Sequence, residues 1–217
     1  VDYISSNNKD KIIKEACVDS TMQAIQAEQD GADRIELCKN LELDGLTPDV
    51  NVIKNTLISV NIPIKVMIRP RAGNFIYHYE DVKKMERDID FCKDMNISEV
   101  VIGALTNSAN IDIKLTDKLA ARAHPMAVTF HKAIDYTEDI LFELSRLSKI
   151  DYISSILTSG GENTALQGSS MITKMINKFG KRFTIIAAGS ITNDTLVQVH
   201  DLINANECHG RKIVCSF

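Results

Sequence analysis

Short apolar runs rich in β-forming residues alternate with longer amphipathic stretches along the whole chain, and this order constrains the fold more than any other feature. Eight runs are expected as strands, at residues 11–18, 33–38, 64–69, 99–104, 127–132, 152–158, 183–188 and 207–210. Seven stretches between them have helical patterns, at residues 20–30, 48–59, 78–96, 112–124, 136–149, 163–179 and 192–204. Strict alternation of this kind predicts an α/β fold with a parallel sheet and crossover helices.

Two architectures satisfy the alternation, a closed barrel and an open doubly wound sheet. Each unit is about 27 residues long, and eight such units are the number that closes a (β/α)8 TIM-type barrel. The first strand is followed by Cys17-Val18-Asp19-Ser20 and not by the glycine-rich fingerprint of a dinucleotide-binding domain. The sequence therefore favours the barrel.

The chain is expected to form one barrel domain over residues 1–217. Residues 1–10 are predicted to be a polar N-terminal arm, and residues 211–217 form an atypical short tail. Only seven residues follow Gly210, so the eighth helix of the barrel is expected to be missing or altered.

Charge and hydropathy exclude several classes of protein. A net charge of −4 argues against a general nucleic-acid binder, which needs a basic face. No apolar run approaches the roughly 20 residues that cross a bilayer, so no membrane partner is expected. Five scattered cysteines do not resemble the framework of a small disulfide-rich domain. We therefore predict a cytoplasmic protein with reduced thiols.

Side chains alternate across a strand, so each predicted strand has one face toward the helices and one toward the barrel axis. The residues on the face toward the barrel axis are unusually polar. They are Glu15, Cys17, Arg34, Glu36, Cys38, Lys65, Met67, Arg69, Thr129 and His131. One interpretation is an ionic network that only plugs the barrel. The other is a functional site, because these residues gather toward the carboxyl ends of the strands, where barrel active sites lie.

Several of these residues suit proton transfer or anion binding. His131 is the best general acid or base, with Asp135 near enough in sequence to orient it, and Glu15 and Glu36 are further proton carriers. Arginine side chains would hold an anion, and the hydroxyl and NH groups after the sixth strand would form a cup for it. The candidate ligand-binding residues are Arg34, Arg69, Arg71, Thr158, Ser159, Gly160 and Gly161.

Cys17 and Cys38 each end a neighbouring strand on the inner face, so their sulfur atoms can approach one another. With assistance from Met67 or His131 they would offer soft ligands suited to Cu(I). The alternative is a pair of inert core cysteines, since free cysteine is among the most buried residue types.

Seven blocks of sequence closely resemble the CutC copper-homeostasis family and span residues 15 to about 210. The blocks are EACVDS at 15–20, GADRIELC at 31–38, GLTP at 45–48, VMIRPR at 66–71, VIGALT at 101–106, VTFH at 128–131 and LTSGG at 157–161. The chain departs from the family pattern at Lys132, at residues 187–190 and after Gly210.

The resemblance implies a cytosolic (β/α)8 barrel that self-associates, as a dimer or larger homo-oligomer. It implies Cu(I) binding at Cys17 and Cys38, which match the cysteines proposed to hold copper in the family. Recurrent rim residues of the family match Glu15, Arg34, Glu36, Arg69, Arg71, His131, Asp135 and Thr158.

Three functions compete on these grounds. The first is copper homeostasis, with Cu(I) bound, buffered or delivered through the inner-face cysteines. The alternative is an enzyme of unknown reaction that acts on a small anionic metabolite, phosphorylated ones included, at the carboxyl-terminal rim. The third is a structural barrel that acts only as an oligomeric interaction protein.

Overall fold

The computed structural model describes residues 11–214. The predicted arm at residues 1–10 and the last three residues of the tail, Cys215 among them, lie outside the described residues.

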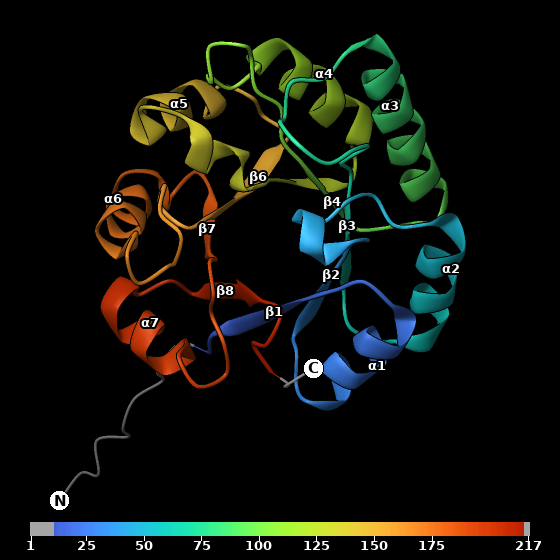
Figure 1. The fold of residues 1–217 in the computed structure, drawn as a ribbon, viewed down its shortest axis with the longest axis horizontal. Coiled ribbons are helices and arrows are strands. Elements are labelled where there is room, and N and C mark those ends of the chain that lie inside the picture. The colour runs from blue at the N-terminus through green and yellow to red at the C-terminus, as the bar shows by residue number, and fades with distance from the viewer. Residues whose placement is uncertain (1–10, 215–217) are drawn as a thin grey trace, which may run out of the picture.

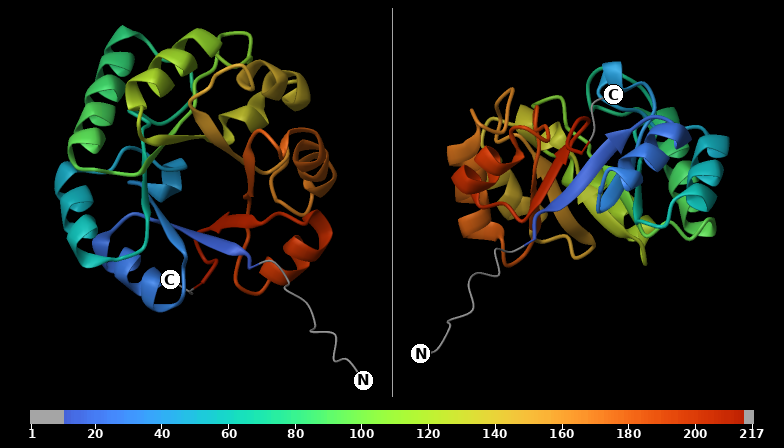
Figure 2. Two further views of the ribbon diagram at one scale, coloured as in Figure 1. Left: turned by 180° about the vertical axis from the view of Figure 1, so that it is seen from behind. Right: turned by 90° about the horizontal axis from the view of Figure 1, so that it is seen from below.

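Eight parallel strands close into a barrel in sequence order, with helices around the outside (Figures 1 and 2), which confirms the predicted α/β barrel. The strands are β1 (Ile13–Val18), β2 (Arg34–Leu37), β3 (Ile64–Met67), β4 (Glu99–Ile102), β5 (Ala127–Phe130), β6 (Ile153–Thr158), β7 (Thr184–Ala187) and β8 (Glu207–Gly210). The helices are α1 (Thr21–Gln29), α2 (Val50–Ser59), α3 (Tyr79–Asp94), α4 (Ile113–Ala123), α5 (Ile140–Leu147), α6 (Ser169–Phe179) and α7 (Leu196–Ile203). Two 3-10 helices, η1 (Leu41–Leu43) and η2 (Lys132–Tyr136), follow β2 and β5.

Most strands predicted from the sequence are one or two residues longer, at one end or both, than the strands of the structure. Cys38, Arg69 and His131 therefore follow β2, β3 and β5 and lie where the strands open into loops. Three helices, α5, α6 and α7, begin at least four residues later than predicted. Residues 132–136 form η2 before α5, and Gly168 stands at the N-terminus of α6. The short strands leave polar side chains at the carboxyl-terminal end of the barrel.

The predicted alternation of faces is confirmed. The apolar residues Ile35, Leu37, Val66, Val128 and Phe130 are buried in the main core, between the sheet and the helices. Cys17, Cys38, Met67 and Val101 form a separate apolar cluster. Because these four residues occupy the alternate strand positions, the cluster lies on the inner side of the sheet.

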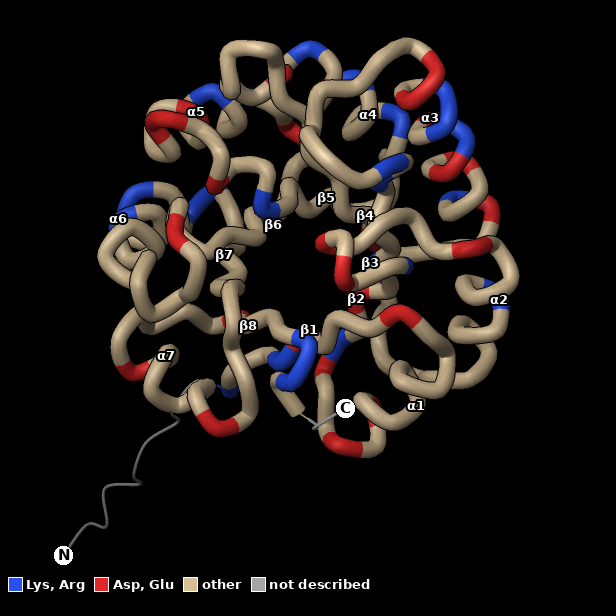
Figure 3. Tube along the Cα trace, viewed as in Figure 1, with Lys and Arg blue, Asp and Glu red and all other residues tan. Residues whose placement is uncertain are grey.

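The chain after β8 forms a turn over residues 211–214, with Ile213 fully buried and a parallel bridge between Thr192 and Lys212. Over residues 11–214, no helix is both long enough and apolar enough to span a membrane. Basic and acidic residues are interspersed along the outer helices such as α3 (Figure 3).

Candidate functional site

An ionic network crosses the barrel axis near the amino-terminal ends of the strands. The carboxylate of Glu15 lies 2.5 Å from Nε of Arg34 and 3.1 Å from Nζ of Lys65. Lys65 also lies 2.9 Å from Glu99, and Arg34 lies 2.5 Å from Glu207. Part of the predicted ionic plug is therefore present, with two carboxylates, Glu99 and Glu207, that the sequence analysis did not include.

The network keeps Glu15 ionised and holds Arg34 near the amino-terminal end of the barrel. Burial alone would raise the pKa of Glu15, but Lys65, a hydrogen bond with His209 and the charge of Arg34 hold it well below its usual range. Glu15 therefore keeps its negative charge near neutral pH and is a poor proton carrier. Arg34 is the first residue of β2, so the structure places it away from the rim where it was expected to clamp an anion.

His209, which the sequence analysis did not single out, lies between two carboxylates. Its Nδ1 is 2.8 Å from Oε1 of Glu15, and its Nε2 is 3.7 Å from Oε2 of Glu36. Burial would lower the pKa of His209, but Glu36 and hydrogen bonds with Cys17 and Glu15 raise it well above its ordinary value. The side chain is therefore an imidazolium inside the barrel.

One oxygen of Glu36 accepts hydrogen bonds from both thiols of the inner cluster. Sγ of Cys17 donates to Oε2 at 3.3 Å, and Sγ of Cys38 donates to the same atom at 3.5 Å. The other oxygen, Oε1, is buried and has no hydrogen-bond partner among the described residues. Burial, opposed by His209 and reinforced by Cys17 and Glu15, raises the pKa of Glu36 to about 8. Glu36 is therefore a much weaker acid than Glu15.

The two cysteines have a spacing that suits a soft metal ion. Their sulfur atoms are 3.9 Å apart, close to the roughly 4.0 Å that two metal–sulfur bonds of about 2.3 Å span in a trigonal site. The hydrogen bond between the two sulfur atoms, with His209 nearby, lowers the pKa of Cys17 despite its burial, whereas the same bond raises the pKa of Cys38. Met67 packs in the same cluster and adds a thioether. This donor set fits Cu(I) better than it fits a hard cation.

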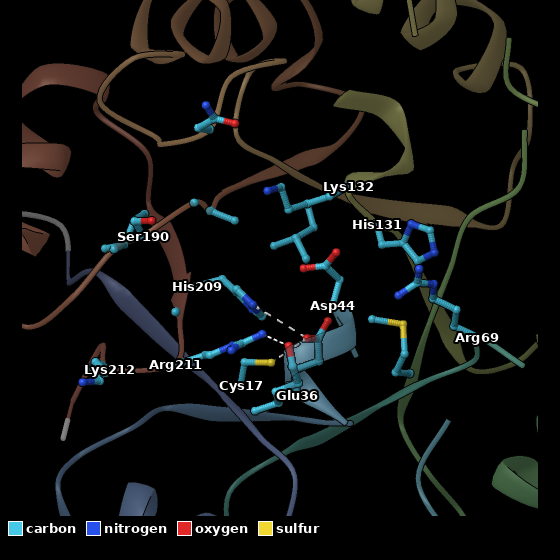
Figure 4. A pocket seen from close by; sticks show the side chains of 18 of the residues that line it. Cys17, Glu36, Asp44, Arg69, His131, Lys132, Ser190, His209, Arg211 and Lys212 are labelled. Atoms are coloured by element: carbon cyan, nitrogen blue, oxygen red, sulfur yellow. Dashed lines mark hydrogen bonds and ion pairs between the residues drawn. The ribbon is translucent and has the colours of Figure 1, made fainter. Parts of the chain in front are cut away.

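A cavity of about 510 Å³ opens at the carboxyl-terminal ends of the strands, above this cluster (Figure 4). Cys17, Glu36 and His209 lie on its wall on the side of β1, β2 and β8. The rest of its polar lining comes from loops and includes Asp44, Arg69, His131, Lys132, Ser190, Arg211 and Lys212.

His131 also lines the cavity, at a distance from Cys17 (Figure 4). Its Nδ1 accepts a hydrogen bond from the backbone NH of Ala133 at 3.1 Å, and its ring packs 4.9 Å from that of Phe75. Burial and the positive charge of Arg69 lower the pKa of His131 to about 3. The imidazole is therefore neutral, and since Nδ1 is an acceptor, Nε2 carries the proton.

Asp135 and the loop after β6 are bound to each other. The Asp135 carboxylate accepts hydrogen bonds from the Thr158 hydroxyl at 2.5 Å, from NH and Oγ of Ser159 at 2.9 Å each, and from the NH of Gly161 at 3.0 Å. The NH of Gly160 donates to Thr158. The predicted anion cup thus holds a carboxylate of the protein itself, and Asp135 supports this loop instead of orienting His131.

The arginines after β3 differ in position. The guanidinium of Arg69 donates to the carbonyl oxygens of Leu43, Gly45 and Gly73, and its Nε has no partner among residues 11–214. Arg71 pairs with Asp81 and lies outside the cavity lining. Of the three arginines expected to bind a ligand, the structure brings only Arg69 to the cavity.

The neutral state of His131 predicts a pH effect on stability. His131→Gln should remove part of the stability loss that the protein suffers as pH falls from 6.5 toward 3. In this range the unfolded histidine takes up a proton, while the buried one, with its lowered pKa, does not until pH nears 3. The difference in unfolding free energy between the two proteins should change by up to about 1.4 kcal/mol per pH unit.

Urea unfolding at a series of pH values measures this difference. Parallel stability curves for the two proteins would contradict the buried, neutral state of His131.

Comparison with known proteins gives a consistent set of relatives. The model of the CutC family matches residues 12–214. The human copper homeostasis protein cutC homolog is 38% identical over 197 residues, covering 91% of this chain and 72% of the human protein. The CutC family protein of Histophilus somni is 35% identical over 195 residues, covering 90% of this chain and 80% of that protein.

Solved structures agree with these matches. CutC from Streptococcus agalactiae superposes with a TM-score of 0.87 at 27% identity, covering 93% of this chain and 99% of that one. A dihydrodipicolinate synthase from Bacillus anthracis, with a TM-score of 0.65 at 16% identity, covers 93% of this chain and 70% of its own. At that identity the likeness is one of fold alone.

Proposed function

Because the chain belongs to the CutC family, we propose that it acts in copper homeostasis by binding one Cu(I) ion through Cys17 and Cys38. The observation that carries the proposal is the distance of 3.9 Å between the two sulfur atoms. They lie inside the barrel at the carboxyl-terminal ends of β1 and β2. Cys17 lines the cavity, which offers a path from solvent to the thiols.

The charges around the thiols support this function. A Cu(I) ion with two thiolates carries one net negative charge, and the neighbouring imidazolium of His209 offsets it. Both thiols must lose their protons for the sulfurs to bind the ion. Glu36, which holds both thiols by one oxygen, positions them before that step.

We propose Cys17 and Cys38 as the copper ligands, and we do not include His131 among them. Nδ1 of His131 accepts a backbone hydrogen bond, whereas the two cysteines lie close enough to Glu36 for the three side chains to hold one metal ion. Met67 is the better candidate for a third soft ligand, since it packs with both cysteines.

An anaerobic Cu(I) titration against a competing chelator tests the proposal. Wild-type protein should bind one ion per chain, and Cys17→Ala/Cys38→Ala should bind it more than about a hundredfold more weakly. Loss of an outer residue that only supports a ligand already costs about 10- to 100-fold. Binding should also weaken on acidification, as protons compete for sulfur.

The chain offers a matched control in Cys92→Ala/Cys208→Ala. Both of these cysteines are free and fully buried, and neither belongs to the inner cluster. The control should bind copper as the wild type does. Equal affinity in all three proteins would make Cys17 and Cys38 ordinary core residues.

Catalysis on a small anion has weaker support. Glu15 is fixed in ion pairs, Asp135 is fixed in its loop, and Arg34 and Arg71 lie outside the cavity lining. The four cysteines within residues 11–214 are all free, which suits a reducing compartment, and we propose the cytoplasm. Self-association stays a prediction of the family resemblance.

A further inference from the structure

A hydrogen-bond donor in the cavity wall has no acceptor. Nε2 of His131 is buried and unpartnered among the described residues, although the neutral ring carries its proton there. A buried donor without an acceptor costs about 1–3 kcal/mol. Such an atom in the wall of a cavity points to a group that enters the cavity and accepts the bond.

The position of this donor is fixed by packing. The His131 ring covers Gly103 so closely that a Cβ there would lie 2.3 Å from Cε1, and its centroid lies 4.9 Å from that of the Phe75 ring. Arg69 packs on Phe75 as well, with its guanidinium carbon 4.8 Å from the ring centroid. The donor and a buried cation are therefore held beside the same aromatic ring.

The charge of the cavity favours an anion. Its lining carries four basic residues, Arg69, Lys132, Arg211 and Lys212, against two acidic ones, Asp44 and Glu36. Positive residues in a partly enclosed cavity concentrate anions from solution.

The lining also has an apolar part. Tyr136, Leu157 and Ile191 contribute to the wall together with Phe75. Cavities of about 300–1,000 Å³ with apolar walls and a few placed polar groups are typical of small-molecule sites. The volume of about 510 Å³ leaves room for a carbon skeleton as well as a charged group.

We propose that this cavity binds a small organic oxyanion, one oxygen of which accepts a hydrogen bond from Nε2–H of His131 beside the guanidinium of Arg69. The oxyanion is a carboxylate or a phosphate ester, since both present acceptor oxygens and negative charge. The site lies in the same cavity as the copper-binding cysteines but uses different residues, so it does not depend on copper binding.

Nuclear magnetic resonance of copper-free protein labelled with ¹⁵N-histidine tests the proposal. The chain has five histidines, and the signal that is missing from the His131→Gln protein identifies His131. Acetate and inorganic phosphate serve as probes, and acetamide is the uncharged counterpart of acetate. We expect a saturable shift of the His131 Nε2 signal with at least one anion and no saturable shift with acetamide.

Variants separate this site from the copper site. His131→Leu removes the donor and should weaken binding of the effective anion at least about tenfold, the usual effect of losing one hydrogen bond to a charged group. His131→Gln keeps an NH donor and should bind more tightly than His131→Leu. Cys17→Ala/Cys38→Ala should bind the anion as the wild type does, whatever its affinity for copper.

The outcomes distinguish the two sources of the anion. Saturation by acetate alone supports a carboxylate ligand, saturation by phosphate alone supports a phosphate ester, and saturation by both supports their shared chemistry. Anion binding that leaves the His131 signal unchanged places the anion on the exposed cations and overturns the proposal. No saturable shift with either anion overturns it as well, even if His131→Leu fails to fold.

Discussion

Replacing Lys65 with methionine is expected to lower the free energy of unfolding by about 3–5 kcal/mol, the usual cost of breaking a buried ion pair by removing one partner. The Lys65 side chain is 1% exposed and lies between Glu15 at 3.1 Å and Glu99 at 2.9 Å. It also donates to the hydroxyl of Thr129 at 3.0 Å. Methionine fills a similar volume, so the loss would come from charge and not from a cavity.

Lys84→Met is the matched control for this prediction. Lys84 pairs with Asp88 at 2.9 Å on α3, but its side chain is 45% exposed, and such pairs contribute about 0–1 kcal/mol. Chemical denaturation of both variants at neutral pH measures the contrast. If the two substitutions cost the same, the network in the barrel does not stabilise the fold.

Replacing Asp135 with alanine is expected to lower the free energy of unfolding by about 3–5 kcal/mol, the cost of leaving two or more buried donors without an acceptor. From the sequence, this residue was predicted to assist catalysis. Its carboxylate accepts four hydrogen bonds from Thr158, Ser159 and Gly161. The variant would leave donors of the loop without acceptors, at about 1–3 kcal/mol for each one that water cannot reach. Thr158 and Ser159 are fully buried, so water reaches them poorly.

Asp139→Ala provides the comparison for Asp135. Asp139 caps α5 by accepting one hydrogen bond from the NH of Phe142 at 2.9 Å, and loss of such a cap costs about 1 kcal/mol. Asp135→Asn keeps one acceptor oxygen and should be intermediate between wild type and Asp135→Ala. Thermal unfolding of the three variants checks the order, and a loss for Asp135→Ala no larger than that for Asp139→Ala would refute the supporting role.

The barrel and its two faces could be predicted from the sequence because both follow from periodicity. Apolar residues such as Ile35 and Leu37 alternate with Arg34 and Glu36, and that alternation alone assigns the faces of β2. The approach of Cys17 to Cys38 follows in the same way, since both end on the inner face of adjacent strands.

His209 could have been found by the same rule, but its strand is short. Residues 207–210 contain only one clearly apolar side chain, Cys208, so the alternation that puts Glu207 and His209 on the inner face is weak. Without His209, the sequence gives no sign of the charge that accompanies the two thiols.

Loop contacts could not be predicted, because they depend on which segments meet in space. Nothing in the sequence near Asp135 shows that its carboxylate binds the loop after β6, 23–26 residues later. Arg71 pairs with Asp81 for the same kind of reason. Asp44 reaches the cavity from the turn after η1, where no periodic pattern exists.

The seam between β1 and β8 has a consequence for the order in which the metal site is assembled. Cys17 and Cys38 are 21 residues apart in the chain, whereas Glu15 and His209 are 194 apart. Closing the longer loop costs about 2 kcal/mol more in chain entropy. The two thiols can therefore meet within the first β-α-β segment, but the imidazolium that balances their charge arrives only when the last strand completes the ring.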